Sequence, residues 1–206
     1  MSSPSAARSL SIAICTFGMP FVMATVKSDG RLASTINRRQ KTLHGDVRWV
    51  ELFEAADIPS AFEPDMLLWL RCHVPMCISF ESISIAGQQR GAGASWAESI
   101  VVARGMQGGF AILRGLGYRL YPSAKSVLSS CPTILVASLL WAISRITSFR
   151  ELLAIGANEC RALVDSVVAA AADVKPGLPA AVAAVSAMKP PALRSDSSAE
   201  RSPRSA

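Results

Sequence analysis

The sequence predicts a mainly α-helical protein with a short β-containing head. Half of the 206 residues are hydrophobic, but Phe, Trp and Tyr together supply only 6%. A core of Ala, Leu, Val and Ile favours closely packed helices over an aromatic β-sandwich. The spacing of apolar residues also changes near Val47, from short runs bounded by turn signals to a helical repeat.

The head, residues 9–60, is expected to begin with a β-hairpin. An apolar run over 10–26 and a second over 32–36 flank Asp29 and Gly30, and Asp-Gly between apolar runs is a hairpin signal. Residues 41–46 then predict a short strand that ends in a turn. A helix is expected from about 47 to 58, before Pro59.

The body, residues 61–190, is expected to be entirely helical. Asp65 suits a helix start, because an acidic side chain favours the first turn. Gly117 suits a helix end. The predicted helices cover 65–80, 96–116, 132–146 and 149–172. Residues 1–8 and the basic tail 191–206 are expected to be disordered.

Charge and cysteine content narrow the class of protein. The net charge of +6 comes mainly from 27–48 and the tail, where aromatic residues are too sparse for a nucleic-acid surface. Five widely spaced cysteines favour reduced thiols and a cytoplasmic location.

Cys72, His73 and Cys77 are too few for the four ligands that zinc prefers, so no metal is expected.

The mean hydropathy of +0.33 raises the question of a membrane. The most apolar internal run, 134–143, is about half the length needed to span a bilayer, so it predicts a buried helix. Arg8 followed by the apolar run 10–26 is also what a secretory signal looks like, although Gly18-Met19-Pro20 interrupts it. That alternative to a cytoplasmic protein stays open.

The glycine-rich loop at Gly91 and Gly93 predicts no cofactor-binding residue. A dinucleotide fingerprint would have its third glycine at Trp96, and no parallel strand is expected before the loop. Residues 93–97 also lack the final glycine of a nucleophile elbow.

The order of several short segments along the chain is typical of one protein family. They are Phe17-Gly18-Met19-Pro20, Asp29-Gly30, 40–45 (QKTLHG), 54–59 (EAADIP), 65–71 (DMLLWLR), 113–118 (LRGLGY) and Asn158-Glu159. In this order, over residues 10–190, the chain resembles the ketopantoate reductase (2-dehydropantoate 2-reductase) family. The resemblance implies a helical C-terminal domain of the 6-phosphogluconate-dehydrogenase-like kind, preceded by a remnant of an α/β Rossmann domain.

The resemblance also implies an activity, which is NADP-dependent reduction of a small 2-oxo acid by a homodimer. The family's catalytic lysine falls on Arg71, its two asparagines on Pro75 and Ser79, and its substrate-binding glutamate on Glu159. Arginine keeps its proton, so Arg71 could hold a carboxylate but is a poor general acid. Ser79 and Glu159 are the expected substrate-binding residues.

The family's glycine-rich cofactor half has no counterpart before Arg71. We therefore expect NADP binding and reduction to fail in this chain alone. The competing interpretation is a non-catalytic module that self-associates through the helices of 97–172.

Overall fold

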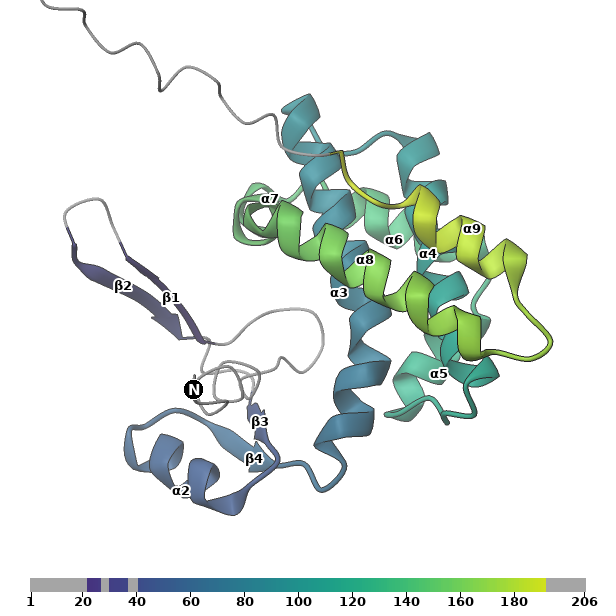
Figure 1. Cartoon of the computed structure of the whole chain (residues 1–206). Helices are drawn as coiled ribbons and strands as arrows, with labels where there is room; N and C mark the ends of the chain where they lie inside the picture. The colour runs from purple at the N-terminus through teal and green to yellow at the C-terminus, as the bar shows by residue number, and fades with distance from the viewer. Residues whose placement is uncertain (1–21, 27–29, 37–40, 192–206) are drawn as a thin grey trace, which may run out of the picture.

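The computed structural model describes residues 22–26, 30–36 and 41–191, and within them the protein is mainly helical, as predicted (Figure 1). A small β-containing head leads into a body of packed helices. The segments 1–8 and 192–206, both predicted to be disordered, lie outside the described residues.

The head contains the predicted hairpin and one strand that was not predicted. Strands β1 (Val22–Val26) and β2 (Leu32–Ile36) pair antiparallel, with Val22 opposite Ile36. Strand β3 (Thr42–His44), helix α2 (Val47–Ala55) and strand β4 (Ser60–Phe62) form a β-α-β unit whose two strands are parallel. The unpredicted β4 ends at Phe62 and completes this unit.

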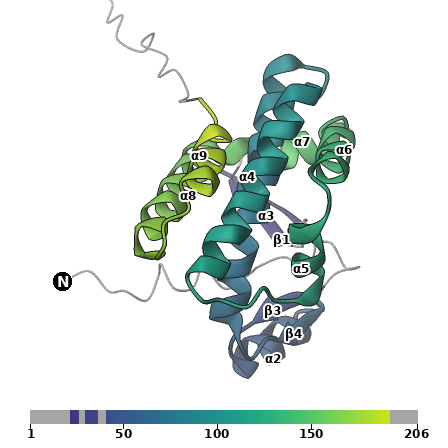
Figure 2. The same cartoon turned by 90° about the vertical axis from the view of Figure 1, so that its right-hand side faces the viewer.

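The body is built on two long helices, α3 (Met66–Arg90) and α4 (Trp96–Gly115). Asp65 caps α3 by accepting a hydrogen bond from the backbone N–H of Leu68. The loop between the helices uses Gly91 and Gly93 at positive φ, +72° and +96°, where other residues are strained. Ser95 then opens α4 with a capping box. Figure 2 shows α3 and α4 side by side along the length of the body.

The later helices differ from the prediction in one important way. The helix expected over 149–172 is broken into α7 (Thr147–Leu153), a 3-10 turn (Ala154–Gly156), α8 (Ala157–Ala170) and a second 3-10 turn (Ala171–Asp173). The break falls at Gly156, and glycine is the weakest helix former after proline. Helix α6 (Thr133–Ile143) lies where a helix was predicted, but it is not the buried helix expected, because only one face packs on the core and Ile134, Leu135 and Leu139 are exposed. Helices α5 (Ser123–Ser130) and α9 (Pro179–Ala187) were not predicted.

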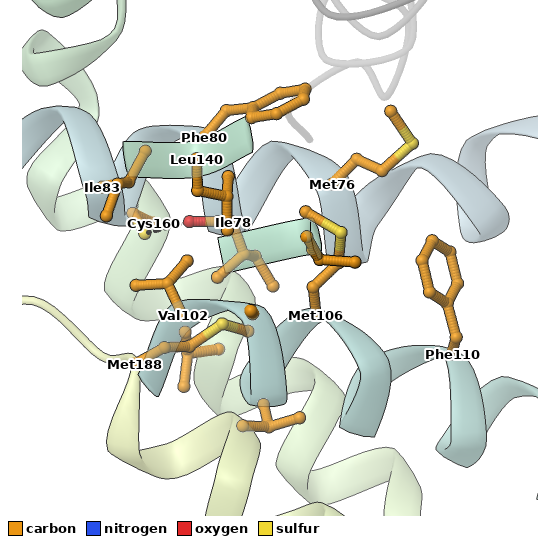
Figure 3. Close-up of a cluster of buried hydrophobic side chains, with 14 of the residues drawn as sticks. Met76, Ile78, Phe80, Ile83, Val102, Met106, Phe110, Leu140, Cys160 and Met188 are labelled. Atoms are coloured by element: carbon orange, nitrogen blue, oxygen red, sulfur yellow. Dashed lines mark hydrogen bonds between the residues drawn. The ribbon is translucent and has the colours of Figure 1, made fainter. Parts of the chain in front are cut away.

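The core lies where α3, α4, α6, α8 and α9 meet (Figure 3). Glycines on α4 let neighbouring helices approach closely. A Cβ atom on Gly108 would lie 2.8 Å from the carbonyl oxygen of Ala181 on α9, and one on Gly109 would lie 3.0 Å from Cβ of Pro75 on α3. These positions therefore fix the spacing of three helices.

Within the part of the chain that the structure describes, no single helix has both the length and the apolar character to cross a bilayer. Helices α5 and α6 meet that test only together, and the pair is bent by 109°.

Candidate functional site

A pocket of about 490 Å³ opens between α3, α5 and α6, with one wall from α4. Its walls are mostly apolar. Their apolar side chains come from Trp69, Met76, Phe80, Met106, Pro122, Ala124, Val127, Leu128, Val136, Leu139 and Leu140. Figure 3 shows Met76, Phe80, Met106 and Leu140 among the buried side chains of the core, so the pocket borders the core directly. A cavity of this size and character is typical of sites for small organic ligands.

Three side chains give this pocket a polar region: Trp69, His73 and Lys125. The Lys125 ammonium donates to the carbonyl oxygen of Trp69 at 3.1 Å and lies 4.2 Å from the centre of the Trp69 ring. The His73 ring stacks on Trp69 with 4.5 Å between ring centres. Lys125 and His73 are each only 5% exposed. We call these three residues the polar cluster.

Local sequence explains how Lys125 comes to lie there. Pro122 ends the segment before α5, and its carbonyl accepts the backbone N–H of Lys125 in the first turn of the helix. His73 lies four residues after Trp69 on α3, so the two side chains share a face of that helix. The α3–α5 contact therefore brings the polar cluster together.

Burial dominates the electrostatics of the polar cluster. It lowers the pKa of Lys125 to about 8, against the smaller opposing effects of Cys72, Cys77 and Glu63. Burial, helped by the charge of Lys125, lowers the pKa of His73 to about 3, so this imidazole is neutral at physiological pH. Its Nδ1 atom is buried and has no hydrogen-bond partner within the described chain. An unpartnered buried nitrogen beside an apolar cavity favours a site that binds a polar ligand group.

The residues that the sequence proposed for a site lie elsewhere and apart. Arg71 is exposed, and its guanidinium lies 4.9 Å from the centre of the Tyr118 ring. Ser79 is fully buried and donates to the carbonyl oxygen of Pro75 at 2.7 Å. The two are separated by about 12 Å along α3, at about 1.5 Å per residue. Glu159 is exposed in the first turn of α8. The structure therefore does not gather Arg71, Ser79 and Glu159 around one cavity.

Glu159 does have a carboxylate neighbour that sequence reasoning missed. Burial, and then the charge of Glu159, raise the pKa of Glu81 to about 7, although a hydrogen bond with Cys160 opposes the shift. Atom Oε2 of Glu81 is buried without a hydrogen-bond partner in the described residues. Gly156 leaves room for this pair, because a Cβ atom there would lie 3.5 Å from Oε2 of Glu81.

The polar cluster was also missed, for reasons that the sequence makes plain. His73 was considered as a zinc ligand, for which its partners are too few, and Lys125 falls in a helix that was not predicted. The pairing of Lys125 with Trp69 spans 56 residues, and no local pattern signals it. The only local hint is the Trp69–His73 spacing.

Comparison of this chain with protein-family models, with curated proteins and with solved structures finds no match.

Proposed function

We propose that this protein binds a small apolar molecule that carries a carboxylate, with the tail in the pocket and the carboxylate at Lys125. One observation supports this most strongly. Lys125 is a buried cation at the side of an apolar cavity, and it forms no salt bridge with any residue that the structure describes.

The physical reason is desolvation. A buried charge is costly unless it is paired and hydrogen-bonded. Lys125 has one backbone carbonyl and the Trp69 ring as partners, which leaves ammonium donors available. A ligand carboxylate in direct contact would supply the counter-charge that Glu63 exerts only from a distance, and the apolar walls would contact the tail. The carbonyl-bearing 2-oxo acids that the family resemblance implies belong to this ligand class.

Titration calorimetry with octanoate and with octanol tests this proposal. The two ligands share a tail and differ in the carboxylate. We expect Lys125→Met to weaken octanoate binding at least about tenfold, which is about 1.4 kcal/mol, and to leave octanol binding nearly unchanged. Lys175→Met, at an exposed lysine, is the matched control. Octanoate affinity that is equal in the wild type and in Lys125→Met would overturn the proposal.

The resemblance supports a further step, NADP-dependent reduction of a bound 2-oxo acid by a 6-phosphogluconate-dehydrogenase-like helical domain in the cytoplasm. Cys72, Cys131 and Cys160 form no disulfide in the described chain, which suits a reducing compartment. The assay is NADPH oxidation with 2-oxo acids of increasing tail length. Because no glycine-rich cofactor fingerprint precedes Arg71, we expect no turnover by this chain alone, and clear turnover would contradict that expectation and leave the binding proposal intact.

Self-association as a homodimer is the second candidate function. Helices α5 and α6 expose several large apolar side chains beside the pocket, with 71% of Val127, 58% of Ile134 and 57% of Leu135 accessible. Apolar patches of this kind mark interaction surfaces. Sedimentation of Leu135→Lys against the control Val47→Lys tests it, because both residues are exposed but Val47 lies in the head. A wild type that stays monomeric at all concentrations would contradict the dimer.

A further inference from the structure

We infer that Lys125 forms a covalent imine with the aldehyde or ketone group of an apolar ligand held in the pocket between α3, α5 and α6. This inference rests on the proposed function, because the same cavity must first bind the ligand. It names the reactive group and the ligand class.

The surroundings of Lys125 separate it from the other lysines of the described chain. Lys189 is held by both oxygens of Asp165, at 2.5 and 2.6 Å, and Lys41 and Lys175 are exposed to solvent. Lys125 instead lines an apolar cavity, is 95% buried and has no carboxylate partner in the described segments. Such surroundings disfavour the charged ammonium and so favour the neutral, nucleophilic amine.

The proportion of neutral amine follows from the same burial. With the pKa of Lys125 lowered to about 8, about half of the side chains are neutral at pH 8. An ordinary lysine, with a pKa near 10.4, is neutral in well under about 1% of molecules at that pH. The buried amine is therefore the more reactive one once a carbonyl ligand is beside it.

The reaction balances without a further reactant. The amine nitrogen bonds to the carbonyl carbon and gives a carbinolamine. The hydroxyl group then leaves as water, which carries away the two amine protons and the carbonyl oxygen, and a C=N double bond remains. His73 contributes a neutral ring whose unpartnered Nδ1 can accept a hydrogen bond from the carbinolamine hydroxyl.

Reductive trapping tests the inference on the full chain. The protein is incubated at pH 8 with octanal or with 2-oxooctanoate, then treated with borohydride and analysed by peptide mass spectrometry. Hydride reduces the imine to a secondary amine, so the modified peptide gains the mass of the ligand less one oxygen atom. We expect modification of Lys125 to be at least about tenfold faster than that of Lys175 or Lys189.

Two controls keep the result interpretable. Lys125→Met removes the amine, so its peptide should lose the adduct, while Lys175 and Lys189 should be modified at the wild-type rate. In the wild type, which needs no variant to fold, an excess of octanoate should protect Lys125 from octanal. If octanoate binds but Lys125 reacts no faster than surface lysines, the inference is wrong and the binding proposal stands. If octanoate does not bind, the binding proposal itself fails.

Discussion

Replacing Glu81 by glutamine should remove a pH dependence of stability that one buried carboxyl creates. Burial and the charge of Glu159 raise the pKa of Glu81 from 4.5 to about 7 in the folded chain. Between these values the folded state binds the proton and the unfolded state releases it. The free energy of unfolding therefore falls as pH rises from about 4.5 to about 7, and Glu81 destabilises the fold above that range.

The magnitude follows from the two pKa values. Their difference corresponds to at most about 3.4 kcal/mol, at about 1.36 kcal/mol for each tenfold change in acidity. The Glu81 side chain is not fully buried, so solvent screening reduces this ceiling, and we expect about 1.5 kcal/mol. Glutamine has nearly the same shape and no charge, so Glu81→Gln should gain this stability at pH 8 and almost none at pH 4.5.

Urea unfolding of the wild type and Glu81→Gln at pH 4.5, 6 and 8 measures the effect. Glu159→Gln should lower the pH at which stability falls, because it removes the like charge beside Glu81. Glu151→Gln, at an exposed carboxylate on α7, should leave the profile unchanged. If Glu81→Gln keeps the wild-type loss of stability between pH 4.5 and 8, the burial argument for this carboxyl is refuted.

Three further changes test the packing of the body, each by urea unfolding. Leu140→Ala on α6 removes a fully buried side chain from the core and should cost about 2–5 kcal/mol; a loss below about 1 kcal/mol would mean that the core is not packed there. Ser144→Ala should cost about 1–3 kcal/mol, because the Ser144 hydroxyl accepts the buried backbone N–H of Ala94 at 3.0 Å, and Ser138→Ala on the exposed face is its control. Gly108→Ala should cost about 1–3 kcal/mol because its new methyl group would meet the α9 backbone, and an unchanged midpoint would show that α9 shifts freely.

The elements predicted correctly are those whose own residues specify them. Helix α4 has its capping box at Ser95 and Glu98, a long apolar face and Gly117 after its end, at φ +84°. The hairpin has its turn glycine, Gly30, at φ +78°. Local signals are enough where a segment carries its own start, periodicity and stop.

The missed elements depend on distant partners. Helix α5 is rich in serine, which favours helix interiors weakly, and contacts with other parts of the chain hold it. Lys125 donates to Trp69 on α3, and Arg114 on α4 donates to Ser129. Strand β4 is three residues long and exists only because β3 pairs with it. Tertiary contacts of this kind leave no periodic pattern in the sequence.

The candidate site shows the same limit. Helical spacing places Arg71, Pro75 and Ser79, which are four residues apart, near one face of α3. It could not predict what covers that face. Pro75 packs against Gly109 on α4 and Ser79 contacts Met188, so most of that face is core rather than cavity. The pocket instead lies beside Trp69 and His73, where α5 and α6 meet α3.

The glycines of α4 have a consequence for the selectivity of the pocket. Met106 lines the cavity, while Gly105 and Gly108 of the same helix leave no space between α4 and the α9 segment. A ligand tail that is too wide would have to push Met106 outward, and α4 cannot retreat without displacing α9. Helix α9 contributes no residue to the pocket lining. It packs behind α4, however, and so keeps the wall formed by Met106 from moving outward. At this wall, the width of the proposed ligand tail is therefore limited by a helix that does not line the pocket.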